Sequence, residues 1–223
     1  MSTVLLDQGI EIPTIHNLAE FRRWALSEEF PQRGRIDYIA GRIEVDTSPE
    51  DFFTHGTFKS EIAARIKNRV DELDLGHTLI ADTRISSVTG DLSAEPDVVV
   101  ISHQAFDEQR VVLVPKASGE PDRFVEVEGG PDLVVEIVSD SSEKKDLRRL
   151  PAAYFRAGIR ELWLLDARGA ELRFDVLHRG SDAFQPAERG ADGYQRSDVL
   201  SARCRLQRTR HARGYWVYRL ELA

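Results

Sequence analysis

Two short apolar segments each contain or adjoin one carboxylate, and this combination limits the folds open to the chain. Residues 98–101 are continuously apolar and follow Asp97, while residues 133–138 are apolar apart from Glu136. Continuous apolar runs of this length are typical of central strands that are buried on both faces. We therefore expect a central sheet that is covered on both sides.

The two carboxylates need compensation in such a sheet. A charged group inside a buried strand costs several kcal/mol unless it is paired, protonated or bound to a cation. Side chains alternate along a strand, so Glu136 is the one polar group on a face that it shares with Val134 and Val138. If the strand that follows Asp97 is its neighbour, both carboxylates converge on one cation, as in many Mg²⁺ sites. The residues alone leave a second interpretation open, in which Glu136 pairs with a buried arginine or lysine.

Hydrophobic periodicity predicts three helices. The first begins at Asn17 with a capping-box pattern and ends near Phe30. The second covers residues 52–73, where apolar side chains recur at helical spacing. The third covers residues 143–157 and contains Pro151, which is unfavourable in a helix interior.

Strands are predicted between and after these helices. The polar segment 107–130, rich in glycine and proline, is interpreted as a loop or edge insertion. The order of elements predicts an α/β or α+β fold, with helices around a mixed central β-sheet and a β-rich C-terminal extension. The predicted strand segments are a hairpin at 36–45, then 78–88, 98–101, 133–138, 162–165, 172–176 and 215–220.

Length and composition indicate one ordinary folded domain. The chain has 223 residues, of which 41% are hydrophobic and 30% charged, so it can bury one full core. We predict a single domain over residues 1–223. It comprises an N-terminal helical segment at 1–34, a core at 35–168 and the β-rich extension at 169–223.

Cysteine content and hydropathy point to a cytoplasmic protein. The single cysteine, Cys204, cannot form an internal disulfide, and the sequence has no Cys/His cluster with zinc-site spacing. No segment resembles a signal peptide, and no run approaches the roughly 18 apolar residues that span a bilayer. We expect a reducing compartment and no membrane partner.

The net charge of -8 excludes a protein that coats nucleic acid by charge alone. Local clusters matter more than the sum, and basic residues gather in two places, at 144–156 and at 203–213. The second cluster is more typical of a solvated hairpin than of a DNA contact. The sequence lacks a glycine-rich phosphate loop, a GxSxG turn and an HExxH motif, which excludes the common NTPases, serine hydrolases and zinc proteases.

Three sequence blocks carry a family resemblance. Residues 95–100 (EPDVVV), 131–139 (PDLVVEIVS) and 154–166 (YFRAGIRELWLLD) resemble the signature blocks of the Uma-two endonuclease family. That family belongs to the PD-(D/E)XK nuclease superfamily and is common in bacteria. The resemblance extends from about residue 35 to the C-terminus. It implies a restriction-endonuclease-like fold and the hydrolysis of phosphodiester bonds in nucleic acid, with DNA favoured over RNA and a homodimer plausible.

The resemblance also implies which residues form the site. In the superfamily, acids at the positions of Asp97 and Glu136 hold Mg²⁺ or Mn²⁺, and a lysine two residues beyond the second acid orients the attacking water. That third position is Val138 here, and the usual replacement position on the following helix is Leu150. Lys145 is the nearest substitute.

Three further residues enter as additional candidates. Lys144 is the second choice for the displaced lysine, although both lysines also fit a solvated helix start. Glu44 resembles an extra metal-site carboxylate of the family, or else belongs to an exposed acidic strand face. His55 falls where the family commonly has a histidine, as a general base or phosphate contact, or else packs at the helix start.

The predicted function is that of a metal-dependent endonuclease with a basic helix, at 144–156, on the nucleic-acid backbone. Two alternatives remain. One is a catalytically inactive nuclease-fold protein that binds nucleic acid or acts as a scaffold, which Val138 and Leu150 favour. The other is a hydrolase that uses Glu136 and a partner carboxylate as an acid and base without metal.

Overall fold

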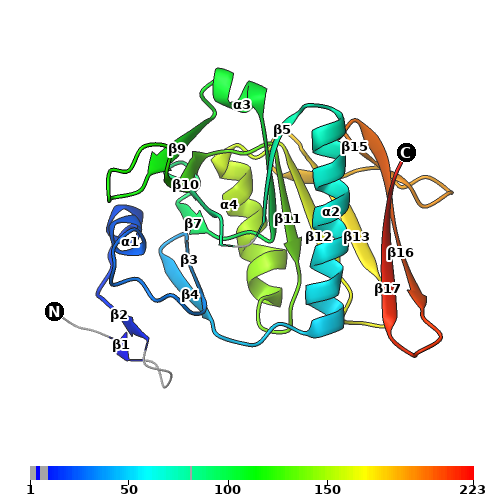
Figure 1. The fold of residues 1–223 in the computed structure, drawn as a ribbon, viewed down its shortest axis with the longest axis horizontal. Coiled ribbons are helices and arrows are strands. Elements are labelled where there is room, and N and C mark those ends of the chain that lie inside the picture. Colours follow the sequence, from blue (N-terminus) through cyan, green and yellow to red (C-terminus); the bar gives the residue numbers. More distant parts are fainter. Residues whose placement is uncertain (1–3, 6–9, 81) are drawn as a thin grey trace.

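A six-stranded sheet forms the centre of the computed structural model, which describes residues 4–5, 10–80 and 82–223 (Figure 1). Its strand order is β14-β13-β12-β11-β8-β5. β11 and β12 are parallel and the other neighbours are antiparallel, so the sheet is mixed as predicted. Its members are β5 (Gly76–Ile80), β8 (Val98–Ser102), β11 (Leu133–Ile137), β12 (Glu161–Asp166), β13 (Arg173–Arg179) and β14 (Phe184–Pro186). Every residue of β8 and β11 is buried, which confirms the interpretation of their apolar runs.

A second six-stranded sheet, absent from the sequence-based expectation, lies on one side of the first. Its order is β4-β3-β7-β6-β10-β9, with β6 and β10 parallel and the other pairs antiparallel. The predicted hairpin at 36–45 is confirmed as β3 and β4. The strands are β3 (Arg35–Ile39), β4 (Arg42–Asp46), β6 (Arg84–Ser87), β7 (Leu92–Ala94), β9 (Val111–Pro115) and β10 (Phe124–Gly129).

Two strand predictions are corrected by this sheet. The segment 78–88 is divided between the two sheets, with β5 in the first and β6 in the second. Of the two interpretations of 107–130, the loop is wrong for β9 and β10, and the edge insertion agrees with their antiparallel pairing at the sheet edge. Valines and glutamates alternate in β10, a pattern typical of a half-exposed strand. The glycines and prolines around it favour a loop, so the local sequence gives two opposed signals.

The three predicted helices are present, but 52–73 and 143–157 are each divided into a π-helical turn and an α-helix, and α3 was not predicted. The side chain of Asn17 accepts a hydrogen bond from the Glu20 backbone N–H (2.9 Å), so the predicted cap is confirmed, but α1 (Leu18–Ala25) ends before Phe30. The Ser27 hydroxyl donates to the Trp24 carbonyl, and the chain turns there. The predicted helix 143–157 is divided into a π-helical turn, η2 (Lys145–Arg149), and α4 (Leu150–Ala157), with Pro151 in the tolerant first turn of α4. The remaining helical elements are η1 (Phe52–Gly56), α2 (Thr57–Glu72) and α3 (His103–Asp107).

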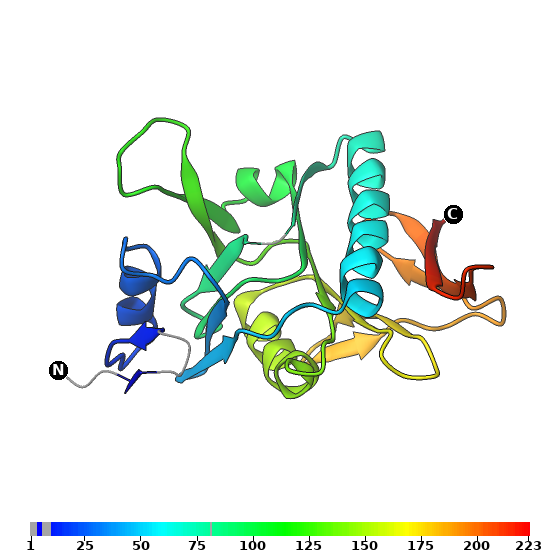
Figure 2. The same ribbon diagram turned by 60° about the horizontal axis from the view of Figure 1, so that its bottom comes forward.

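Both faces of the central sheet are covered, as the apolar strands predicted. α2 and a three-stranded C-terminal sheet pack on one face, and α4 with the second sheet packs on the other (Figure 2). The C-terminal sheet consists of β15 (Gln195–Ser197), β16 (Ala202–Arg210) and β17 (Trp216–Leu222). A third apolar cluster joins α1 and β3 to the segment around β2 (Glu11–Ile12), which pairs with β1 (Val4–Leu5). None of the described helices combines the length and the hydropathy that a membrane span requires.

Candidate active site

The carboxylates Asp97 and Glu136 lie on neighbouring strands. In the antiparallel β8–β11 pair, Val98 is opposite Val135, and continuing this register by one residue puts Asp97 opposite Glu136. The backbone N–H of Ile137 donates to Asp97 Oδ2 at 2.7 Å, which fixes the aspartate against β11. Both side chains are buried. The structure therefore brings together the two acids that the sequence singled out.

Asp97 is surrounded by cationic groups. Its Oδ1 lies 3.1 Å from Arg35 Nη2, 3.1 Å from Lys59 Nζ and 3.7 Å from His55 Nε2. Burial alone would raise the pKa of Asp97, but the contact with His55 and the charges of Arg35 and Lys59 hold it well below its usual range. Asp97 is therefore a fixed negative centre.

The carboxyl group of Glu136 differs from that of Asp97 in its hydrogen bonds and in the direction of its pKa shift. Its Oε1 accepts a hydrogen bond from the Tyr154 hydroxyl, while its buried Oε2 has no hydrogen-bond partner among the described residues. Burial, together with the charges of Asp146 and Asp97, raises the pKa of Glu136 well above its usual value. A carboxylate oxygen left unpartnered beside Asp97 fits a ligand position for a cation that would restore the ionised form.

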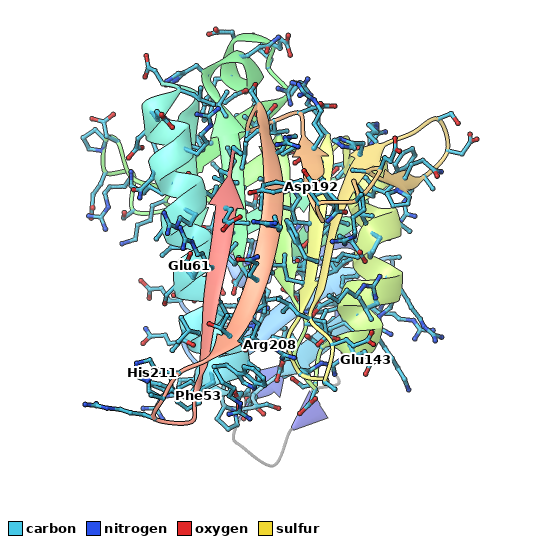
Figure 3. The ribbon with its side chains drawn as sticks, turned by 90° about the vertical axis from the view of Figure 1, so that its right-hand side faces the viewer. Phe53, Glu61, Glu143, Asp192, Arg208 and His211 are labelled. Atoms are coloured by element: carbon cyan, nitrogen blue, oxygen red, sulfur yellow. The ribbon has the colours of Figure 1, made fainter. Side chains whose placement is uncertain are left out.

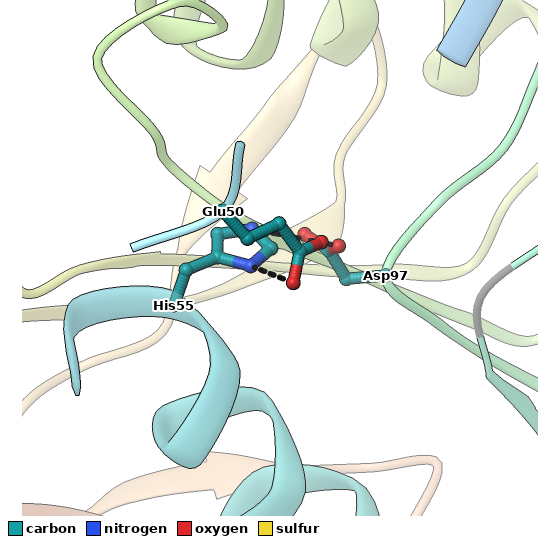
Figure 4. A group of neighbouring side chains, drawn as sticks. All are labelled: Glu50, His55 and Asp97. Carbon is teal, nitrogen blue, oxygen red and sulfur yellow. Dashed lines mark ion pairs between the residues drawn. The ribbon is translucent and has the colours of Figure 1, made fainter. Parts of the chain in front are cut away.

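A second group of possible metal ligands includes a residue that the sequence analysis missed. Glu50, His55 and Asp97 each offer a ligand atom, and these atoms lie within 4.8 Å of one another (Figure 4). Glu50 Oε2 is 3.2 Å from His55 Nδ1, and Glu50 Oε1 is 2.7 Å from Lys59 Nζ. Burial disfavours the charged imidazole, but Asp97 and Glu50 raise the pKa of His55. Lys59 was not predicted from the sequence either. Its spacing of four residues from His55, one helical turn, was the available signal that the two side chains lie together.

Lys145 lies in the buried polar cluster behind this group. Its Nζ is 2.8 Å from Asp37 Oδ2, and Asp37 Oδ1 accepts a hydrogen bond from the Glu95 backbone N–H at 3.0 Å. Burial opposes the charge of Lys145, yet Asp37, Asp146 and Glu136 raise its pKa above the ordinary value. For Asp146, burial raises the pKa to about 6. Lys145 is thus a permanent cation within electrostatic reach of Glu136.

The remaining candidates lie further out. The Glu44 carboxylate is bound by Arg149 Nη2 at 2.9 Å, although Glu44 lies opposite Asp37 in the β3–β4 pair. Lys144 is exposed and borders a different surface hollow, which also contacts Arg42 and Arg149. The structure therefore separates Lys144 from the carboxylates and leaves Glu44 at the margin, already paired.

A polar cavity of about 460 Å³ opens onto the site. Arg35, Glu50, His55 and Lys59 all line it, which gives the Asp97 cluster access to solvent. A larger hollow of about 1000 Å³ lies between α1 and the β9–β10 pair, with mainly apolar walls. Because the titratable groups gather at the smaller cavity, we take that cavity as the candidate active site.

Tyr154 has a measurable structural role at this site. Replacing Tyr154 by phenylalanine removes the buried hydroxyl that donates to Glu136, so we expect a loss of about 1–3 kcal/mol in the free energy of unfolding. The measurement is urea denaturation in the presence of a chelator. Tyr194→Phe is the matched control, because its hydroxyl donates to the less buried Glu221 and its loss should cost less. Equal effects of the two variants would contradict this role.

The chain is similar to known proteins over most of its length. The family Uma2, described as "Putative restriction endonuclease", matches residues 18–210, a range that contains every residue discussed at the site. The crystal structure of a putative nuclease belonging to DUF820, from Anabaena variabilis, has a similar fold, with a TM-score of 0.60 at 19% sequence identity. The similarity covers 84% of this chain and 92% of that one. No curated protein matches this sequence.

Proposed function

The chain belongs to the Uma2 family, and on this premise we propose that it is a metal-dependent endonuclease that hydrolyses phosphodiester bonds, preferably in DNA. One observation carries the proposal: a fixed anionic Asp97 lies opposite Glu136, whose buried oxygen lacks a partner among the described residues. The cationic residues that contact Asp97 line a polar cavity. The predicted division into an N-terminal segment, a core and a C-terminal extension of one domain is retained as part of this proposal.

The donor set suits a divalent cation such as Mg²⁺ or Mn²⁺. Asp97 and Glu136 would hold it, and Glu50 or His55 would complete the protein ligands, since Asp97 belongs to both groups. When bound, the cation would polarise the phosphoryl group and lower the pKa of a coordinated water. Glu44 is proposed as a marginal contributor only, because Arg149 already binds its carboxylate.

The cationic side chains have separate proposed roles. Arg35 and Lys59 line the cavity, so their guanidinium and ammonium groups can bind the phosphate of the substrate. Lys145, fixed by Asp37, orients the attacking water beside Glu136 and replaces the lysine absent at Val138. For His55, which lies 3.2 Å from Glu50, the proposed role is to accept a proton or contact the phosphate.

An inactive nuclease-fold protein is the second candidate function, and one observation favours it. Arg35 and Lys59 already neutralise Asp97, so this carboxylate is compensated without a cation. Cleavage of supercoiled plasmid, with and without Mg²⁺ or Mn²⁺, separates the candidates, with structured RNA as a parallel substrate. We expect cleavage that needs the cation and disappears with a chelator. Binding without cleavage would establish the inactive alternative, and cleavage that survives exhaustive chelation would establish metal-free acid–base hydrolysis.

A further inference from the structure

A cluster of exposed and half-buried aromatic rings lies beside the site. We define the aromatic groove by Phe52 and Phe53 of η1 together with Tyr215, Trp216 and Val217 at the start of β17; its volume is about 580 Å³. Phe52 is 70% exposed and Phe53 37%. A contiguous group of large apolar side chains on a protein surface commonly marks an interaction site.

The rings of the groove form a continuous ladder. Phe52 packs edge-on against Phe53, with ring centres 4.9 Å apart, and Phe53 stacks on Tyr215 with an interplanar angle of 9°. Tyr215 in turn stacks on the exposed His211 ring at 4.5 Å. Figure 3 shows Phe53 and His211 close together at the end of the β16–β17 hairpin. Parallel rings at an exposed edge are a surface on which further flat groups can stack.

The hairpin that borders the groove is basic, and Glu61, which lines the groove, is paired with Arg65. The hairpin at 202–222 has six arginines and one glutamate, although the whole chain is acidic. Arg208 and Arg210 lie over the Trp216 ring, at 4.3 and 4.0 Å from its centre. Within the described part of the chain, Arg210 and Arg213 form no ion pair, whereas Arg203, at the opposite end of the hairpin, pairs with Asp192.

The groove and the active site share one segment of chain. Phe52 and Phe53 belong to η1, which also carries His55, and Glu50 lies just before η1. Residues of 50–59 line the polar cavity, and residues of 52–61 line the groove. A strand bound along the groove would therefore extend toward Asp97.

We propose that the aromatic groove binds an unpaired segment of the nucleic-acid strand whose scissile bond lies at the neighbouring active site. Phe52, the most exposed ring of the groove, offers stacking to bases, and the guanidinium groups of Arg210 and Arg213 offer positive charge to phosphates. In a duplex the base faces are covered by neighbouring pairs, so this combination selects single-stranded nucleic acid. The substrate class is then nucleic acid with a single-stranded segment beside the scissile bond. This inference rests on the proposed function for the location of the cut, but not for the binding itself.

Binding of a fluorescent oligothymidylate of about 15 nucleotides tests the proposal, with a blunt duplex of the same length for comparison. All measurements contain a chelator, so they do not depend on cleavage. We expect Phe52→Ala to weaken single-strand binding about tenfold. Arg210→Ala with Arg213→Ala should reduce the slope of log affinity against log salt by about 0.7 for each phosphate that the arginines no longer neutralise. Phe124→Ala, an exposed phenylalanine on β10, and Arg203→Ala are matched controls that should bind as the unmodified protein does.

Two results would overturn the proposal. One is single-strand affinity that is the same in Phe52→Ala, in the double arginine variant and in the controls. The other is a dimer that becomes a monomer in Phe52→Ala, by sedimentation, while oligonucleotide binding stays constant; the groove would then be an interface between two copies of the chain. A protein that never cleaves but shows the expected binding pattern would contradict the proposed function alone.

Discussion

Replacing Asp97 by asparagine should reduce cation-dependent cleavage on the order of a thousandfold. Asp97 is the one residue shared by both groups of possible metal ligands, and its low pKa makes it the permanent anion of the site. The amide has the same shape and can still accept a hydrogen bond from the Ile137 backbone, so the fold should persist. Initial rates of plasmid nicking over a range of Mn²⁺ concentrations measure the effect.

The control for this variant is Asp132→Asn. Asp132 is also buried, accepts a hydrogen bond from the Ser102 backbone N–H at 2.7 Å and binds Arg110 at 2.7 Å, but it lies outside the site. Both variants should lose stability, because each removes a charge from a buried hydrogen-bonded pair. Only Asp97→Asn should lose cleavage. Equal cleavage by the two variants would refute the role of Asp97.

A measurement of Mn²⁺ affinity separates the two ligand groups. Glu136→Gln should weaken Mn²⁺ binding strongly if the metal is held between β8 and β11, whereas Glu50→Gln should do so if it is held at the cavity rim. Titration with Mn²⁺, followed by paramagnetic resonance, reports this affinity without any substrate. A cation-dependent site that neither variant affects would contradict both assignments.

Replacing Lys145 by methionine should lower kcat for cleavage about a hundredfold and change KM little. Methionine has a similar length but no charge, so the water beside Glu136 would lose its orienting ammonium. The variant also leaves Asp37 buried without its partner, which costs about 3–5 kcal/mol of stability. Single-turnover rates, measured where urea denaturation shows the variant to be folded, check this expectation.

A second substitution removes the structural effect. Combining Lys145→Met with Asp37→Asn eliminates the unpaired buried charge, so stability should recover while cleavage stays low. Lys144→Met, at the exposed neighbouring lysine, is the control and should cleave at the normal rate. Recovery of cleavage in the double variant would show that Lys145 only supports the fold.

The sequence predicted the candidate site residues that lie on or beside strands, but few of those that lie in the segments between strands and helices. Asp97 and Glu136 were recognisable because a charge in an apolar strand is costly, and strand alternation gave the face on which Glu136 lies. Glu50 gave no such signal, because an acid in a polar segment is ordinary. Its position beside His55 follows from the turn at η1, where the Asp51 side chain accepts hydrogen bonds from the backbone N–H groups of Phe53 and Thr54.

For the fold as well, the elements with a local sequence pattern were predicted and the long-range pairings were not. β8, β11 and the capped start of α1 were predicted from local patterns that tertiary contacts reinforce. The second sheet was not, because β6 and β10 are parallel and come together across about forty residues of chain, a pairing that no local pattern specifies. The pairing of Lys145 with Asp37 is likewise a product of the tertiary fold.

The wide spacing of the partners along the chain has a consequence for the newly made protein. Arg35 and Asp97 are 62 residues apart, and Asp37 and Lys145 are 108 apart, in different layers of the structure. Until those layers dock, Asp97 and Asp37 lack the cationic partners that fix their positions. A partly folded chain would thus have no working centre, and its ability to cut nucleic acid would arise only when folding is complete.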